Sequence, residues 1–188
     1  MNLPKGRRDY DTINAKVAER FTCHHADTIR CKKVKANNQP EYRHQCTTCG
    51  MQVGNAITYS EISLTARDSL PEWDDGIYRQ FDARKSAYRQ EWTEKEDERI
   101  YQDWIRQYRI YLKTAEWKRL RDRIIERAGT VCEGCGNGTP TEVHHLTYAH
   151  AGEEFLFELA ALCKRCHDRL HPQGDEPPAD ATPPPWQL

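Results

Sequence analysis

The most informative stretch in the C-terminal third of this 188-residue chain is Leu162-Cys163-Lys164-Arg165-Cys166-His167-Asp168-Arg169-Leu170-His171. Its two cysteines form a Cys-x-x-Cys pair, a tight turn that can place two thiolates on one tetrahedral zinc ion. His167 and His171 are four residues apart, so they share one face if the segment is helical. The stretch therefore predicts a zinc knuckle that leads into a helix with two aligned imidazoles.

A second pair, Cys132 and Cys135, precedes that stretch and could close a four-thiolate zinc site with it. A closed site of four cysteines has no open position, so its role would be structural. Between the pairs, His144 and His145 lie in a strand-like segment, where adjacent side chains point to opposite faces. We expect one of the two to join the downstream histidines as a metal ligand and the other to act as a general base. Free core thiols or redox motifs are the alternatives to zinc.

These residues resemble the HNH endonucleases, the ββα-metal nucleases, of phages and bacteria. The resemblance covers residues 114–171 and implies a zinc-stabilised α+β domain that hydrolyses DNA. It is carried by Cys132-x-x-Cys135, Val143-His144-His145, Leu159-x-x-Leu162-Cys163-x-x-Cys166-His167, His171 and the preceding Glu116-Trp117-x-x-Leu120-Arg121.

The resemblance implies a role for each matched position. His145 would be the general base, while His144, His167 and His171 would hold one divalent ion (Mg²⁺, Mn²⁺, Ni²⁺ or Zn²⁺). The chain departs from the family at Glu158, which stands where the family has its middle Asn. Two roles follow for Glu158: its carboxylate can brace the loop and the base in place of that Asn, or its charge can alter the metal preference. His150, in the same loop, is a weaker candidate for a phosphate or metal contact.

Residues 1–60 predict a second, zinc-ribbon-like module. A helix over 10–21 is followed by two strands around the turn at 36–40, and the returning strand ends at Cys46-x-x-Cys49. This hairpin would bring Cys23 and one histidine to the knuckle, and we favour His25 over His24 because a one-residue gap lets alternate side chains converge. A hairpin without metal is the alternative. Cys31, in mid-strand, is expected to pack in the core.

Residues 70–113 predict a helical connector, because apolar residues recur at gaps of about four. Thr93-Glu94-Lys95-Glu96 fits a capping box, which favours a break between two helices there. The aromatic stripe on this segment would pack against the rest of the chain or against a second copy, giving a homodimer.

Basic side chains suggest two surfaces for DNA, although a solvated face explains each of them equally well. One lies on a helix expected from 115 to 128, capped by Thr114 and ended by Gly129. The other lies on the N-terminal hairpin. The candidate DNA contacts are Lys118, Arg119, Arg121, Arg123, Lys32 and Lys33.

Composition narrows the classes of protein to which this chain can belong. Residues 1–50 carry ten Lys and Arg against five Asp and Glu, whereas the Pro-rich tail 172–188, expected to be disordered, carries three acids and no base. No window reaches the roughly 18–20 apolar residues of a membrane span, and no secretory signal is evident. We therefore expect a cytoplasmic enzyme of a bacterial host cell, with no membrane partner and no small-molecule cofactor. The rival expectation is a zinc-dependent nucleic-acid-binding or packaging-associated protein that does not cleave.

Overall fold

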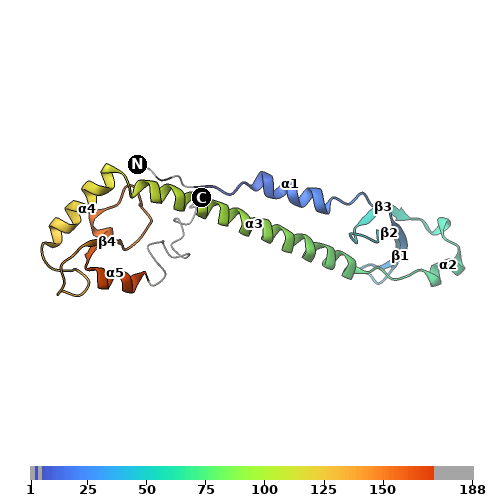
Figure 1. Cartoon of the computed structure of the whole chain (residues 1–188). Coiled ribbons are helices and arrows are strands. Elements are labelled where there is room, and N and C mark those ends of the chain that lie inside the picture. The colour runs from blue at the N-terminus through green and yellow to red at the C-terminus, as the bar shows by residue number, and fades with distance from the viewer. Residues whose placement is uncertain (1–2, 4–5, 172–188) are drawn as a thin grey trace. The chain divides into compact units, whose positions relative to one another are not determined.

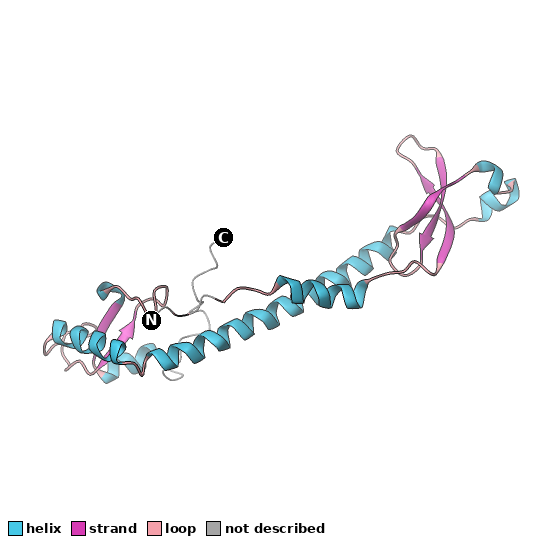
Figure 2. Ribbon diagram, turned by 90° about the horizontal axis from the view of Figure 1, so that it is seen from above, coloured by secondary structure: helices cyan, strands magenta, loops and turns pink. Residues whose placement is uncertain are grey.

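The computed structural model describes residue 3 and residues 6–171 in two compact units. Residues 9–94 form the first unit, and residues 3, 6–8 and 95–171 form the second. The helical segment expected at 70–113 is therefore divided between the two units. The proline-rich tail lies outside the described residues. Elements of both kinds are present, which confirms a mixed α+β fold (Figures 1 and 2).

In the first unit, helix α1 (Tyr10–Phe21) lies alongside the early turns of helix α3 (Asp75–Tyr111) (Figure 1). The Asp9 carboxylate caps α1 by accepting from the backbone N–H of Thr12. The ring of Phe21 lies 5.6 Å from the rings of both Phe81 and Tyr88. The aromatic stripe of α3 is thus covered from within the chain here, and this packing does not require a second copy.

Helix α3 is continuous, so the expected break at Thr93 is wrong. The capping-box pattern fails because the Thr93 hydroxyl donates to the carbonyl of Arg89, four residues earlier in the same helix. A Thr bonded in this way stays within the helix instead of satisfying the free N–H groups of a new N-terminus.

The first unit also contains an antiparallel sheet of β1 (Thr28–Val34), β2 (Pro40–Cys46) and β3 (Gln52–Ile57), in that order (Figure 2). The hairpin of β1 and β2 is confirmed, with Thr28 opposite Cys46. Cys31 is 1% exposed, as its expected packing role requires. The third strand was not expected, because Gly54 and Asn55 interrupt any alternating pattern. A 3-10 turn η1 (Tyr59–Glu61) and helix α2 (Leu64–Ser69) follow.

The second unit places a two-stranded sheet between helices. Its elements are α4 (Ala115–Ala128), β4 (Glu142–His145), the 3-10 turn η2 (Leu156–Glu158), β5 (Leu159–Leu162) and α5 (Lys164–Leu170). Helix α4 is capped by Thr114 and ends at Gly129, whose φ is +62°, as expected. Strands β4 and β5 are antiparallel, with His145 opposite Leu159, and α5 follows to complete a ββα order.

The last turns of α3 belong to the core of this second unit. Trp104, Tyr108 and Tyr111 are each at most 5% exposed and pack in one cluster with Trp117 of α4 and Leu159 of β5. The end of α3 is therefore a wall of this unit as well as a connection to it. Among the described residues, no helix combines the length and the apolar character that crossing a membrane requires.

Candidate active site and metal centres

The four C-terminal cysteines converge as one group, which we call the C-terminal thiolate group: Cys132, Cys135, Cys163 and Cys166. The turn after α4 supplies the first pair, and the start of α5 supplies the second. The Sγ atoms of Cys135 and Cys163 are 3.9 Å apart, and two thiolates on a tetrahedral zinc ion would be separated by about 3.8 Å. The spacing and the donor type both fit a closed structural zinc site.

Backbone geometry prepares this group to be ionised. The N–H of Cys163 donates to the Sγ of Cys132 at 3.1 Å, and the N–H of Gly134 donates to it at 3.4 Å. These bonds, the first above all, lower the pKa of Cys132 to about 6. The thiolate is the form that binds zinc, so the fold favours the ligand state of this side chain.

The N-terminal thiolate group consists of Cys23, His25, Cys46 and Cys49. The loop after α1 supplies the first two, and the end of β2 supplies the second two. The Sγ atoms of Cys23 and Cys46 are 3.6 Å apart, and the Sγ of Cys49 lies 3.3 Å from Nδ1 of His25. His24 is exposed and lies outside the group. Four donors again fit a closed zinc site.

Three histidines form a separate cluster, the imidazole group: His144, His167 and His171. His144 is on β4, His167 is on α5 and His171 caps the C-terminus of α5. Nδ1 of His144 lies 2.8 Å from Nε2 of His171. Burial, followed by the two neighbouring imidazoles, lowers the pKa of His144 to about 4. Neutral imidazoles are metal ligands, and three protein ligands leave a position open for water or substrate.

A pocket of about 170 Å³ opens beside the imidazole group. Helices α3, α4 and α5 and strand β4 all contribute to its wall. The residues that line it are Tyr108, Leu112, Trp117, Arg121, Glu142, Val143, His144, His145, Tyr148, His167 and His171.

His145, the expected general base, lies on this wall, but its side chain is only 3% exposed. Its ring is stacked between Trp117 and Tyr148, at 4.9 Å and 5.2 Å between ring centroids. Nδ1 lies 3.1 Å from the hydroxyl of Tyr108, and Nε2 lies 3.0 Å from a carboxylate oxygen of Glu154. Both ring nitrogens therefore have partners, and the ring is held in one orientation.

Glu158, at the family's Asn position, contacts the loop but not the base. Its carboxylate contacts Nδ1 of His150 at 2.7 Å and accepts from the backbone N–H of Phe155 at 3.0 Å. It braces the loop between β4 and β5, but the carboxylate on His145 comes from Glu154. The prediction that Glu158 also braces the base is therefore wrong. Glu154 was missed because no motif marks it within the loop.

Some of the candidate DNA contacts already have a partner within the protein, and the others are exposed on α4. Arg121 donates to the carbonyl of Thr141 and lines the pocket. On the hairpin, Lys32 pairs with Glu72 at 3.4 Å, and Lys33 lies over the ring of Trp73 at 4.4 Å from its centroid. Of the four candidates on α4, the other three, Lys118, Arg119 and Arg123, are exposed.

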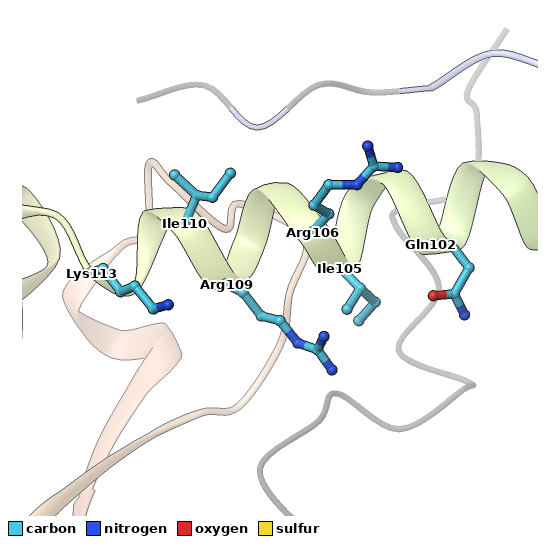
Figure 3. A pocket seen from close by; sticks show the side chains of 6 residues that line it. All are labelled: Gln102, Ile105, Arg106, Arg109, Ile110 and Lys113. Carbon is cyan, nitrogen blue, oxygen red and sulfur yellow. The ribbon is translucent and has the colours of Figure 1, made fainter.

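A second hollow, of about 380 Å³, lies along α3 (Figure 3). Its polar side chains do not point to one spot: Arg109 and Lys113 extend to one side of the helix, and Arg106 extends to the other (Figure 3). It therefore lacks the converging polar groups of the pocket beside the imidazole group.

Comparison with known proteins links part of the chain to one family model. No curated protein and no solved structure matches the chain. Residues 132–173 match the family model described as HNH endonuclease, a stretch that contains the C-terminal thiolate group, both strands and the imidazole group. Tyr108, Tyr111 and Trp117 precede the matched stretch. The spacing, the ββα order and this match together show that residues 132–173 are similar to an HNH endonuclease domain.

Proposed function

We propose that this chain is a metal-dependent endonuclease that hydrolyses DNA phosphodiester bonds, with His145 as general base and one divalent ion at the imidazole group. The observation that carries the proposal is the meeting of His145 and the imidazole group on the wall of one pocket. The match of this segment to the HNH endonuclease family supports it.

The residues of the pocket divide the work. The ion, when bound, stabilises the negative charge that develops on the phosphate and on the leaving 3′ oxygen. His145 accepts a proton from the attacking water, for which an imidazole is suited because its pKa lies near neutrality. Arg121, on the same wall, attracts the phosphate. The basic side chains exposed on α4 extend that attraction along the DNA backbone.

The two thiolate groups hold structural zinc in this proposal. Their four donors leave no open position, so they stabilise the fold and take no part in hydrolysis. At the imidazole group, three nitrogen ligands favour a transition metal such as Mn²⁺, Ni²⁺ or Zn²⁺ over Mg²⁺. Thiolates stay reduced in the bacterial cytoplasm, where we place the enzyme.

Cleavage of supercoiled plasmid tests the proposal directly. The full chain is incubated with plasmid and Mg²⁺, Mn²⁺ or Ni²⁺, and nicked and linear products are measured on gels. We expect His144→Ala and His145→Ala to lose cleavage by a factor of about 100 or more while the zinc of the thiolate groups is retained. His24→Ala is the matched control and keeps the wild-type rate, because His24 is exposed and outside every metal group.

A DNA-binding protein without cleavage activity is the second candidate, and the burial of His145 favours it. The same reactions separate the two. Binding of labelled duplex without cleavage in any of the three ions would overturn the nuclease and establish the second candidate.

A further inference from the structure

Four side chains form a continuous hydrogen-bonded chain behind the pocket. The order is Tyr108 hydroxyl, His145 ring, Glu154 carboxylate and Tyr111 hydroxyl, with separations of 3.1 Å, 3.0 Å and 2.7 Å. The Glu154 side chain is 1% exposed. The backbone N–H of Gly152 also donates to Glu154, at 2.9 Å. A buried carboxylate with three hydrogen-bonding neighbours is held in one position, unlike a mobile loop side chain.

The charge state of Glu154 decides which nitrogen of His145 carries the proton. Burial alone would raise the pKa of Glu154, but its hydrogen bonds to His145, Gly152 and Tyr111 outweigh burial, and the pKa is lowered. An ionised carboxylate only accepts hydrogen bonds, so Nε2 of His145 must donate to it. In a neutral ring, Nδ1 then carries the lone pair and is the hydrogen-bond acceptor. That lone pair faces the hydroxyl of Tyr108, another residue of the pocket wall.

We propose that Glu154 is the positioning residue of the general base: it holds His145 as the Nε2–H tautomer and leaves Nδ1, beside the Tyr108 hydroxyl, as the proton acceptor. This inference rests on the proposed function, because it assigns an orienting group to the proposed base. A carboxylate that fixes the tautomer of a catalytic histidine is a general device in hydrolases, where the wrong tautomer is costly.

Helix α3 completes this arrangement from outside the family match. It supplies both tyrosines, one helical turn apart, so that Tyr108 contacts the base and Tyr111 contacts its positioning residue. Trp117 and Tyr148 hold the plane of the ring by stacking on its two faces. The matched stretch 132–173 therefore lacks both tyrosines of the hydrogen-bonded series and one of the two rings that stack on His145.

The kinetic test compares isosteric variants of the full chain on plasmid DNA. Glu154→Gln keeps the shape but removes the charge that demands a donor at Nε2, so we expect kcat to fall about 100-fold with KM unchanged. Tyr111→Phe leaves the carboxylate on His145, and we expect a loss of only about threefold. Glu153→Gln, in the exposed neighbouring residue, keeps the wild-type kcat and is the matched control. Zinc content and circular dichroism show that each variant is folded.

The tautomer itself is measured without DNA, by long-range ¹H–¹⁵N spectra of the ¹⁵N-labelled full chain carrying its zinc. His145 signals are identified by their loss in His145→Ala. We expect the Nε2–H pattern in the wild type and in Tyr108→Phe, because Glu154 sets the tautomer and Tyr108 only follows it. In Glu154→Gln we expect a mixture of the two tautomers.

The inference is overturned if Glu154→Gln keeps both the wild-type kcat and a pure Nε2–H ring. It is also overturned if Tyr108→Phe changes the tautomer and Glu154→Gln does not, because Tyr108 would then be the positioning residue. Failure of the proposed function has a different signature: the wild type would not cleave DNA in any ion, while the spectra would still report whether Glu154 orients the ring.

Discussion

The two thiolate groups are built alike, but their surroundings differ. Each joins two segments that are distant in the sequence, and each presents four donors within 4.8 Å of one another. Only the C-terminal group has a three-donor imidazole group in the same unit, with a pocket beside it, among the residues that the structure describes. A group of four donors fits a closed metal site that stabilises the fold. A group of three donors leaves a position where water or substrate can bind and react.

The largest contrast should come from adjacent residues of α5, Cys166 and His167. Cys166→Ser removes one of four donors from a closed site, and structural zinc contributes on the order of 10 kcal/mol to small metal-dependent folds. We expect this variant to bind one zinc fewer and to lose the cooperative unfolding transition of the second unit, together with all cleavage. Zinc analysis and thermal denaturation measure both effects.

His167→Ala should separate activity from stability. It removes a donor from the imidazole group but leaves the C-terminal thiolate group intact, so the unit stays folded. We expect a loss of cleavage by a factor of about 100 to 10,000, with a melting temperature close to that of the wild type. If His167→Ala unfolded the unit as Cys166→Ser does, the imidazole group would be structural and the comparison would fail.

The N-terminal group offers a weaker effect on cleavage and a matched control. Cys46→Ser should lose one zinc and destabilise the unit of residues 9–94, yet leave kcat within about twofold of wild type, because the pocket residues all belong to the other compact unit. Cys31→Ser changes a cysteine that is equally buried but belongs to no metal group.

For Cys31→Ser we expect full zinc content and a cost of about 1 kcal/mol in unfolding free energy, since the new hydroxyl can donate to the nearby Gln45 side chain. Zinc stoichiometry and denaturant unfolding distinguish the two variants. Equal loss of zinc from both would show that the N-terminal group is not the binding site.

Short-range spacing predicted which residues gather in the candidate metal-binding groups. Cys-x-x-Cys turns and the four-residue gap between His167 and His171 are local constraints, so the structure groups these residues as the spacing indicates. The caps at Thr114 and Gly129 were predictable for the same reason. The residues that contact His145 were not predictable, because Tyr108, Trp117 and Glu154 reach it from three different elements or loops. Only tertiary packing brings such residues together, and no periodicity or motif records it.

The structure differs most from the sequence-based expectations in the surface charge of the hairpin. The hairpin was expected to offer a basic face for phosphate, but two of its basic residues, Lys35 and Arg43, both pair with Glu41, at 3.4 Å and 2.7 Å. Lys32 and Lys33 also have partners, namely Glu72 and the ring of Trp73. A charge that must leave a partner to reach a phosphate gains less from doing so.

The smallest expected effect follows from this pairing. The double variant Lys32→Ala with Lys33→Ala should change the slope of log K against log salt by less than about 0.5, because few counterions are exchanged at paired side chains. Lys118→Ala with Arg119→Ala, in exposed residues of α4, should lower that slope by about 1 to 2. Fluorescence anisotropy with duplex DNA at several salt concentrations measures both. A larger change from the hairpin pair would make the first unit the main DNA-binding surface, and the two units would then differ in binding as well as in chemistry.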